Sequence, residues 1–477
     1  MSDDDLTLVL DIGKSRAKLL MIDALGEVVE EHARENRSVT STLGYPALDV
    51  RGLTQWVART LAGSSRSVRC VDAIASTHGA AIVALGDGDE LAWDPIDYEF
   101  EGCRSLHDAY QAARDSFAAT FAPDLPAGLN AARQLHWLQL THPTAWARTR
   151  MLVPYPQYWA WWLSGIAASE LSSLGCHTQL WRPGELRYTD LAKRFGWAER
   201  FARIKPAWSV LGPVLPERAR ETGLPVTCRV HVGVHDSNAC LARLLHGGER
   251  MTLVSSGTWV VVMAPGASST ALDPRRDMLA NVSVRGERVP TARFMGGREL
   301  EAICAGAAPA LASEQGLAEL MCDEIQAVPS FASQGGPFGG EAGGVLRRLD
   351  AIDARAALGP VQRASLAALY CAQVTAWLLE RLEAPLPLVV DGPFADNALY
   401  LQVLAALLPA GSVRVGIDPV EGTARGAWML AHWSEPALER RVRTIEPGVL
   451  AERIKVHYRR WQALLPRDAQ TSAALSR

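Results

Sequence analysis

The sequence lacks several features that mark common functional classes. No apolar run reaches ~18 residues, the length of a membrane-spanning helix, and the nearest stretch, YPQYWAWWLSGIAA, is short and interrupted. Lys and Arg number 48 against 52 Asp and Glu, so the net charge of -4 gives no basic field for nucleic acid or anionic lipid. The segment MSDDDLTLVL is acidic and lacks the basic region of a signal peptide. We therefore expect a cytoplasmic protein with no nucleic-acid partner and no membrane partner.

Patterns that mark metal or disulfide frameworks are missing too. The eight cysteines are scattered without a Cys-x-x-Cys pair, which favours reduced thiols. His231 and His235 have an i, i+4 spacing, but HVGVH has the pattern of a strand and a glycine turn, where this spacing does not put both rings on one face. We predict no zinc site there. The sequence has no Gly-x-x-x-x-Gly-Lys-Ser/Thr, so any phosphate site does not use a Walker loop.

Strand and helix patterns alternate along the 477 residues, which predicts an α/β architecture of more than one domain. LTLVLDIGKSRAKLLMID (6–23) predicts a hairpin of two apolar strands, and MTLVSSGTWVVVMAPG (251–266) repeats the pattern. Two similar hairpins suggest two related halves. HGGER (246–250) breaks the pattern, so we predict domains at 1–246 and 247–477.

Periodicity places further elements around these hairpins. In the first half it predicts helices at 53–63, 128–140 and 154–165, a strand–turn–strand at 68–85, and a strand–turn–helix at 230–245. In the second half it predicts helices at 361–384, 397–409 and 421–433, and strands at 386–392 and 412–417.

The two hairpin tips are candidate phosphate sites, because glycine lets backbone N–H groups approach a phosphate and small hydroxyl side chains add donors. The first tip holds Asp11, Gly13, Lys14 and Ser15, and the second holds Ser256, Gly257 and Thr258. The alternative for the first tip is that Asp11 and Ser15 only satisfy backbone groups of the turn.

Three other segments carry candidate chemistry, each with a structural alternative. Asp236 follows a glycine turn and opens a helix, so it is either a general base for a hydroxyl or a helix cap. His78 lies in a turn between apolar strands, where a histidine is more often structural. Gly392-Pro393, followed by Asp396-Asn397, either lies flat against a purine and ribose or is a plain strand-to-helix connection.

Taken in order, these segments resemble the FGGY family of carbohydrate kinases over nearly the whole chain. Asp11-x-Gly13 resembles the first phosphate hairpin of the family, Ser76 to Gly79 its sugar-contact turn, and GVHD the segment with the catalytic base. SSGTW resembles the second phosphate hairpin and is most similar to the rhamnulokinase and fuculokinase-like branch. DGPFADN and EGTARGA resemble the paired adenosine motifs. The resemblance implies an α/β fold of two actin-like (ribonuclease H-like) ATPase domains with an interdomain cleft.

The resemblance also implies an activity: ATP-dependent phosphorylation of a primary hydroxyl on a small ketose or deoxyketose, such as a rhamnulose-, fuculose- or xylulose-like sugar. Asp236 would be the base and contact the sugar, and Asp11 would bind Mg²⁺ through water. The other implied sugar contacts are His78, Asp97, Glu99 and Gln157. The implied ATP contacts are Gly13, Lys14, Ser15, Ser256, Gly257, Thr258, Gly296, Gly392, Pro393, Asp396 and Asn397. Whether the chain forms a homodimer stays open.

Some positions depart from the family pattern. Lys14 stands where a threonine or small residue is common, and could contact phosphate directly or form a salt bridge across the cleft. The usual Trp-x-Asp-x-Arg sugar loop is replaced by AWDPIDYEFEG, with no arginine before Arg104, and the adenosine motif begins at Asp391. Two other hypotheses therefore stay open: another actin-like ATPase, and a non-catalytic sensor of sugar or nucleotide.

Overall fold

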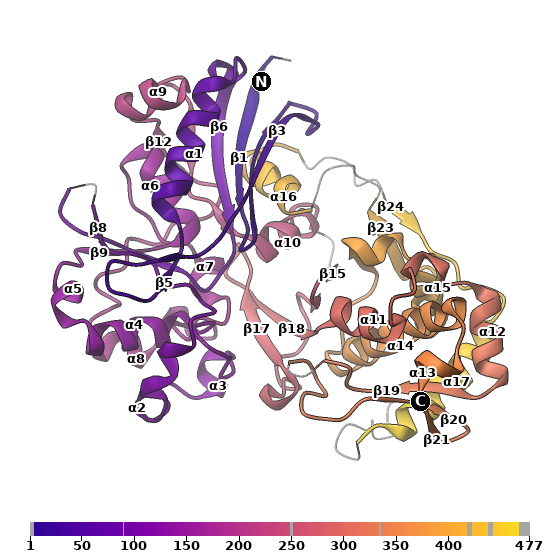
Figure 1. Ribbon diagram of the computed structural model, residues 1–477. Helices are drawn as coiled ribbons and strands as arrows, with labels where there is room; N and C mark the ends of the chain where they lie inside the picture. The colour runs from indigo at the N-terminus through magenta and orange to yellow at the C-terminus, as the bar shows by residue number, and fades with distance from the viewer. Residues whose placement is uncertain are drawn as a thin grey trace. The chain divides into compact units, whose positions relative to one another are not determined.

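The computed structural model describes residues 4–88, 90–248, 251–332, 335–416, 422–436 and 442–466. The chain divides into two compact units, each treated separately below (Figure 1). Unit 1 holds the described residues of 1–249, 279–289 and 419–438, and unit 2 holds those of 250–278, 290–418 and 439–477. The domain boundary expected between 246 and 247 stays a prediction, and the segments 279–289 and 422–436 group with unit 1.

The main sheet of unit 1 has the strand order β12-β13-β6-β1-β2-β3, with β14 also pairing with β6. The first predicted hairpin is confirmed, because β1 and β2 pair antiparallel through the register Asp11 to Lys18. β1 and β14 both run parallel to β6. The strand bounds are β1 Leu6–Ile12, β2 Arg16–Ile22, β3 Val28–Glu35, β6 Cys70–Thr77, β12 Val210–Pro213, β13 Arg229–His231 and β14 Val234–His235.

Helices cover both faces of this sheet (Figure 1). Side chains alternate between the faces of a strand, and Leu8 and Leu10 of β1 belong to the core cluster that includes residues of α1 (Val50–Gly63) and α6 (Tyr155–Ser164). Thr7, on the opposite face, hydrogen-bonds through Oγ1 to His432 Nε2 (2.9 Å), beside α16 (Gly422–Ala431). α10 (Asp236–His246) packs against α16 on this second face.

The contact between α10 and α16 depends on glycine. A Cβ atom at Gly426 would lie 1.8 Å from the carbonyl oxygen of Ala239, so a larger residue would force the two helices apart. The helix predicted at 421–433 is confirmed by α16 for the part that the structure describes, and Gly426 is the residue that lets it pack closely.

A second layer of unit 1 surrounds a three-stranded sheet in the order β8-β7-β9. Its core includes Trp93, Trp137 and Trp197, all buried. The strands are β7 Ile82–Leu85, β8 Leu91–Trp93 and β9 Met151–Pro154, and the helices are α2 His107–Ala113, α3 Phe117–Thr120, α4 Ala131–Thr141, α5 Pro143–Ala147, α7 Leu171–Gly175 and α8 Asp190–Arg194; α9 Pro216–Thr222 packs against α1.

The main sheet of unit 2 contains β18-β16-β15-β22-β23-β24 in that order. The second predicted hairpin is confirmed by β15 and β16, which pair antiparallel, and β15 runs parallel to β22. The bounds are β15 Thr252–Ser256, β16 Val260–Met263, β18 Arg288–Phe294 (from residue 290 in unit 2), β22 Leu388–Asp391, β23 Val413–Gly416 and β24 Val442–Thr444. β17 (Met278–Val282) precedes β18, and its residues from 279 group with unit 1.

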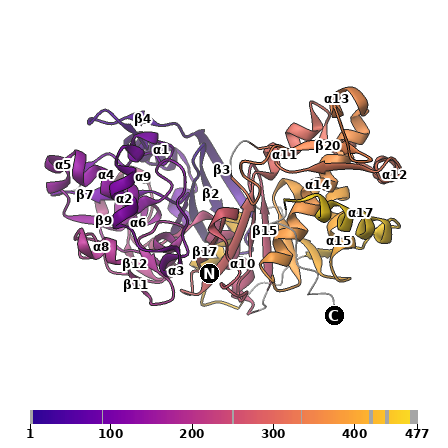
Figure 2. The same ribbon diagram turned by 90° about the horizontal axis from the view of Figure 1, so that it is seen from below.

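The helices of unit 2 gather around the long buried helix α14, which contacts α11, α12 and α15 (Figures 1 and 2). The predicted helix at 361–384 is confirmed by α14, and the one at 397–409 by α15. The helix bounds are α11 Gly296–Cys304, α12 Glu314–Cys322, α13 Ala354–Ala357, α14 Pro360–Arg381, α15 Ala398–Leu407 and α17 Ala451–Leu464, and a small sheet holds β19 Ile325–Val328, β20 Gly344–Arg347 and β21 Asp350–Ile352.

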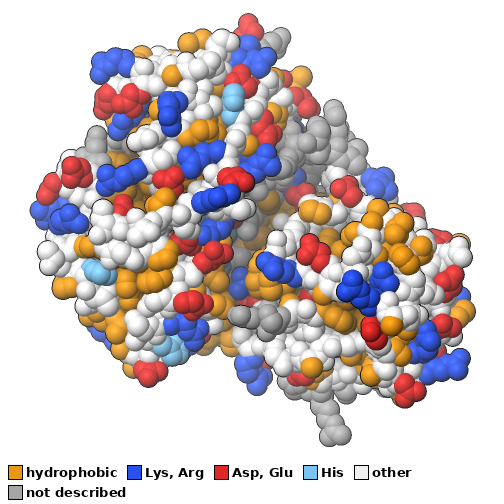
Figure 3. All heavy atoms as spheres, viewed as in Figure 1, with side chains coloured by type: hydrophobic (Ala, Val, Ile, Leu, Met, Phe, Trp, Pro, Cys, Tyr) orange, Lys and Arg blue, Asp and Glu red, His pale blue; other side chains and the backbone are white. Residues whose placement is uncertain are grey.

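Acidic and basic side chains are interspersed over the face of the molecule shown in Figure 3. Within the described residues, no helix combines the length and apolarity needed to cross a membrane.

Candidate active site

The carboxyl ends of three parallel strands of unit 1 bring the two predicted carboxylates to one edge of the sheet. Asp11 pairs with Ser76 near the end of β1, and on the other side of β6 His235 pairs with Thr77 at the end of β14. Asp236 follows immediately as the first residue of α10. By strand alternation Asp11 faces the same side as Thr7, the side that α10 covers. Ligands of open α/β sheets bind at such carboxyl edges.

Asp236 is placed as a base would need to be. Its side chain is 32% exposed, and Asp236 is the first residue of α10, directly after the N-cap His235. The carboxylate also satisfies a backbone N–H of the first turn, which is the structural role given as the alternative. The carboxylate accepts a hydrogen bond at Oδ1 from the backbone N–H of Ser237 (2.6 Å). A carboxylate in the first turn of a helix interacts favourably with the helix dipole, and its partly exposed oxygens are placed to accept a proton.

His235 lies directly behind this carboxylate, with Nε2 3.2 Å from Asp236 Oδ1. Burial disfavours the imidazolium, but the Coulomb interactions with Cys176 and Asp236 outweigh it and raise the pKa of His235 to about 9. His235 is therefore a buried cation at neutral pH, paired with Asp236. This histidine was considered only as a zinc ligand from its spacing. Its pairing with Asp236 depends on the turn from β14 into α10, and its environment on the proximity of Cys176 after α7.

His78 offers a hydrogen-bond acceptor in the same region. Its Nδ1 lies 2.9 Å from the carbonyl oxygen of Gly79 and must be the donor, so Nε2 is the acceptor of the neutral ring. Burial lowers the pKa of His78, which keeps the ring neutral. Among the described residues, His78 Nε2 has no hydrogen-bond partner. An unsatisfied buried acceptor indicates that a ligand hydroxyl or a water completes this site.

His78 and His235 line one small cavity together with Gly79, Ala80, Ala81, Ile82, Pro154, Pro156, Ser173 and Thr178. A Cβ atom at Gly79 would lie 2.6 Å from His235 Nε2 and 2.9 Å from Cys176 Sγ, so glycine is needed for these groups to approach the turn. Gln157 is buried nearby on α6 and donates from Nε2 to the carbonyl oxygen of Gly233 (3.0 Å). In the described chain its Oε1 has no partner, and a role in sugar binding stays a prediction.

The predicted sugar loop meets the first hairpin tip through Lys14. The ammonium group contacts Asp97 and lies 3.3 Å from Glu99 Oε2 and 3.3 Å from Ser38 Oγ. Burial of Asp97 favours its neutral form, but hydrogen bonds from Lys14 and Ser38 outweigh this and lower the pKa of Asp97. Lys14 therefore forms a salt bridge within unit 1, and not the salt bridge across the cleft that was one of its two predicted roles.

The rest of this hairpin tip is held by Asn36. The Nδ2 group of Asn36 donates to the carbonyl oxygen of Gly13 (2.7 Å). The backbone N–H of Asn36 donates to the carbonyl oxygen of Ser15 (2.9 Å). A Cβ atom at Gly13 would lie 3.0 Å from the carbonyl oxygen of Arg16. The turn is thus tight and its backbone conformation is fixed before any ligand arrives.

In unit 2 the second hairpin tip lies against the start of α11. Thr258 is exposed and Gly257 partly exposed. A Cβ atom at Gly297 would lie 2.5 Å from the carbonyl oxygen of Gly257, and one at Gly296 would lie 2.4 Å from Val260. Gly297 donates from its backbone N–H to the carbonyl oxygen of Thr258 (3.2 Å). The structure therefore brings the predicted Gly296 to the hairpin and adds Gly297, which the sequence analysis missed.

The Gly392 turn lies beside the same tip. Ser256 Oγ donates to the carbonyl oxygen of Asp391 (2.6 Å) and accepts from the N–H of Phe394 (2.9 Å), which fastens the turn to β15. Gly392 has φ +81°, and its Cβ position is only 2.0 Å from the carbonyl oxygen of Ser256, so this position requires glycine. The turn continues through Pro393 and Asp396 as a short 3-10 helix.

The side chain of Asn397 caps α15 by accepting from the N–H of Tyr400 (3.0 Å). This is the structural role given as the alternative for the segment. Contacts of Asp396 and Asn397 with a nucleotide stay predictions.

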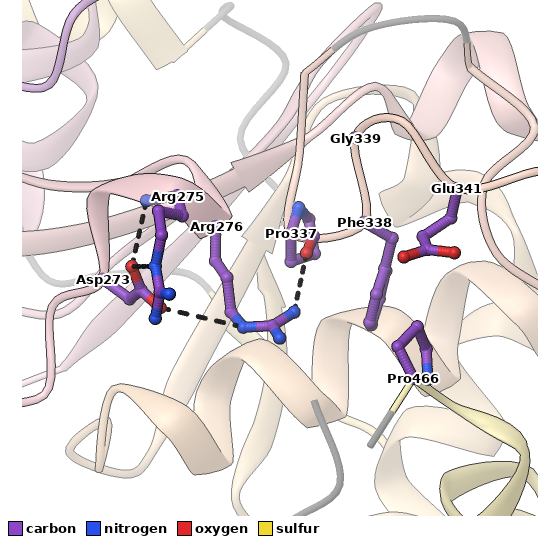
Figure 4. Close-up of a pocket in the computed structure, with 8 residues that line it drawn as sticks. All are labelled: Asp273, Arg275, Arg276, Pro337, Phe338, Gly339, Glu341 and Pro466. Atoms are coloured by element: carbon purple, nitrogen blue, oxygen red, sulfur yellow. Dashed lines mark hydrogen bonds and ion pairs between the residues drawn. The ribbon is translucent and has the colours of Figure 1, made fainter. Parts of the chain in front are cut away.

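A separate polar pocket of about 110 Å³ lies elsewhere in unit 2 (Figure 4). Within it Arg275 pairs with Asp273 (2.9 Å), and Arg276 lies 3.9 Å from Asp273 and donates to the carbonyl oxygen of Pro337 (2.9 Å). The predicted site residues are not among those that line it, which are Asp273, Arg275, Arg276, Pro337, Phe338, Gly339, Glu341 and Pro466.

Comparison with known proteins places this arrangement in a family. The family model for the C-terminal domain of FGGY carbohydrate kinases matches residues 248–440. A carbohydrate kinase from Novosphingobium aromaticivorans is 33% identical, with a TM-score of 0.84 over 96% of this chain and 98% of that one. The chain belongs to the FGGY family of carbohydrate kinases. The members of this family are enzymes that phosphorylate sugars and use ATP as the phosphoryl donor. The predicted family and the two-domain actin-like fold class are confirmed.

Other FGGY relatives are more distant. A xylulose kinase from Staphylococcus epidermidis is 25% identical over 276 residues, which are 54% of this chain and 53% of that protein. The chain thus spans about half the length of the curated relatives it matches. A gluconate kinase from Lactobacillus acidophilus is 12% identical with a TM-score of 0.75, over 96% of this chain and 97% of that one, and shares the fold alone. The rhamnulokinase and fuculokinase-like branch stays a prediction.

Proposed function

We propose that this FGGY kinase transfers the γ-phosphoryl group of ATP to a primary hydroxyl of a small sugar, a ketose or deoxyketose, with Asp236 as the general base. The observation that carries the proposal is the position of the Asp236 carboxylate. It is partly exposed, it lies at the carboxyl edge of the sheet, and it adjoins the cavity lined by His78 and His235. A hydroxyl bound there would lie where its proton can reach a carboxylate.

The sugar would be oriented by hydrogen-bond acceptors. His78 Nε2 would accept from one hydroxyl, and the Asp236 carboxylate would accept from the hydroxyl that attacks phosphorus. As the bond between the sugar oxygen and phosphorus forms and the bond to the ADP leaving group breaks, the proton moves to Asp236, so positive charge does not build up on the attacking oxygen. Asp97, Glu99 and Gln157 are further proposed contacts.

ATP would be held by the two hairpin tips and the Gly392 turn. The backbone N–H of Ser15 in unit 1, and those of Gly257 and Thr258 in unit 2, would bind phosphate oxygens. The Gly13 N–H donates to the carbonyl oxygen of Arg16 (2.9 Å), so Gly13 would act by letting a phosphate approach the tip closely. The close glycine contacts at Gly297 and Gly392 keep the unit 2 tip and its neighbouring turn compact. The adenosine would lie against the segment from Gly392 to Asn397.

The donor set at the sheet edge fits a magnesium ion. Asp11 supplies a hard carboxylate at this edge, and Mg²⁺ in phosphoryl-transfer sites is commonly held by one or two carboxylates, phosphates and waters. Within the described residues there is no cluster of three or more His, Cys, Asp or Glu that could form an all-protein metal cage. Asp11 would hold the ion through water, and the bound ion would neutralise charge on the transferred phosphate.

A screen with MgATP tests the proposal by measuring ADP release with ketoses, aldoses, polyols and sugar acids. Asp236→Asn keeps the shape of the side chain but removes the base, so kcat should fall by about 10²–10⁴-fold. Binding of ADP, measured by calorimetry, should be retained. Asp87→Asn is the matched control, because Asp87 is 81% exposed and pairs with Arg150 at the surface.

The outcomes separate the hypotheses. Sugar-dependent turnover that Asp236→Asn abolishes and Asp87→Asn preserves supports the proposal. ATP hydrolysis that does not depend on sugar would favour another kind of actin-like ATPase. Nucleotide binding without turnover on any compound would favour a sensor.

A further inference from the structure

We propose that Lys14, which stands in the first phosphate hairpin, is a positioning and specificity residue of the sugar loop and not a ligand of the nucleotide phosphates. The inference rests on the proposed function and deepens it, because it assigns the substrate class that the site accepts.

The contacts of the ammonium group carry the first step. An ammonium group has three N–H donors and no acceptor. The Nζ atom of Lys14 has three oxygen partners within the sugar loop and its neighbour: Asp97 Oδ2, Glu99 Oε2 at 3.3 Å and Ser38 Oγ at 3.3 Å. The side chain is only 21% exposed. Its donors are therefore used within unit 1, and a phosphate oxygen would have to displace one of these partners.

The charge balance points the same way. The Asp97 side chain is 3% exposed, and a buried carboxylate needs a paired cation. Asp97 uses Oδ2 for Lys14 and Ser38, and Oδ1 for the backbone N–H of Glu99 (2.9 Å). Moving Lys14 to a phosphate would leave this carboxylate buried without a cation. The ammonium group is thus held beside Asp97 by the requirement to pair this buried carboxylate.

Lys14 also connects the loop to the sugar-facing histidine. Its Nζ atom lies 5.3 Å from the centre of the Tyr98 ring, a cation–π distance. The Tyr98 ring in turn meets the His78 ring edge to face, with centres 5.4 Å apart. Removal of the ammonium group would release Tyr98 and Asp97 together and so loosen the wall against which His78 is held.

This arrangement determines which substrates fit. The two cations of the site, Lys14 and His235, are already paired with carboxylates. The groups turned toward a ligand, His78 Nε2 and the Asp236 carboxylate, accept hydrogen bonds. Hydroxyl groups can donate to them, whereas the carboxylate of a sugar acid would meet acceptors and negative charge. This charge pattern supports the neutral sugars of the proposed function over sugar acids, and Lys14 contributes to it by staying paired with Asp97.

Kinetics of three variants test the inference. Lys14→Met removes the charge, Lys14→Arg keeps it, and Arg16→Met removes an exposed charge from the same hairpin as a control. Loss of a charged hydrogen-bond network should raise the KM of the best neutral sugar roughly tenfold or more. The KM of ATP and the Kd of ADP should stay within about twofold, because no phosphate contact is lost. Lys14→Arg should recover most of the sugar affinity, and Arg16→Met should behave as the wild type.

Several results would overturn the inference. If Lys14→Met raises the Kd of ADP and leaves the KM of the sugar unchanged, or raises both equally, Lys14 is a phosphate ligand or a general structural residue. Faster turnover of an aldonate than of any neutral sugar would refute the substrate class.

A wild-type protein that phosphorylates no compound would refute the proposed function instead. In that case the role of Lys14 is decided by hydrogen exchange and ADP calorimetry. Faster exchange of the amides at 97–99 in Lys14→Met with an unchanged Kd supports the inference, and a weaker Kd or unchanged exchange overturns it.

Discussion

Replacing Gly392 by alanine should destabilise unit 2 for two independent reasons. At φ +81° and ψ -169° the backbone is in a region that is essentially restricted to glycine, and a side chain there costs about 1–3 kcal/mol. The new Cβ would also lie 2.0 Å from the carbonyl oxygen of Ser256, a backbone atom of β15 that cannot move alone. Overpacking of this kind costs about 1–3 kcal/mol more. We expect a loss of about 4 kcal/mol, which lowers the Tm by about 10 °C for a domain of this size.

Scanning calorimetry of Gly392→Ala beside Gly257→Ala measures this effect against a matched control. A Cβ at Gly257 would have the carbonyl oxygen of Trp259, at 4.0 Å, as its nearest neighbour, so the folded state has room for it. Gly257→Ala should keep the Tm but weaken ADP binding, because the methyl group would lie where a phosphate approaches the tip. A Gly392→Ala protein with the wild-type Tm would refute the reasoning, and so would an equal loss of stability in both variants.

Three more changes test the structure of unit 1. The pKa of His235 is raised to about 9 from an ordinary 6.5, so its contribution to the free energy of unfolding is complete below pH 6.5 and is lost as the pH rises through 9. In urea unfolding, the free energy of unfolding should decrease by about 3 kcal/mol across this window in the wild type, and His235→Gln should lack this decrease. Asp72→Asn should lower the free energy of unfolding by about 2–3 kcal/mol in the same assay, because the buried carboxylate binds Arg229 (2.6 Å), a partner that is itself half exposed. An unchanged urea midpoint would contradict this expectation. Gly426→Ala should separate α10 from α16, since its Cβ would lie 1.8 Å from the carbonyl oxygen of Ala239. We expect it to lower the free energy of unfolding by about 1–3 kcal/mol. If the Tm and kcat both stay at wild-type values, the close contact is not required.

Much of the fold could be predicted because it depends on local pattern. The alternation of apolar residues in β1 and the glycine at its tip specify a strand and a tight turn within one short segment. The same holds for β15 and β16, and for α14, whose periodicity extends over six turns of helix. Asp11 and Asp236 could be proposed as site residues for a related reason, since each stands next to a glycine turn at the end of an apolar strand.

Other parts of the site have no local signal. His235 was identified only as a residue that does not bind zinc, and its pairing with Asp236 requires the exact start of α10. The contacts of Lys14 with Ser38 and Asp97 join residues from three separate segments. Gly297 has no feature in the sequence that distinguishes it from Gly296, yet it is the one that approaches the backbone of the hairpin tip.

The sequence by itself determined which segments become strands, helices and turns, and which residue types stand at their ends, because these depend on hydrophobic period and on the conformational freedom of glycine. The tertiary structure decided which ends meet. A salt bridge such as Lys14 to Asp97, a hydrogen bond such as Thr7 to His432, and a glycine contact such as Gly392 to Ser256 all depend on distances across the fold. Coulomb energy, desolvation and steric overlap vary with those distances and not with separation along the chain.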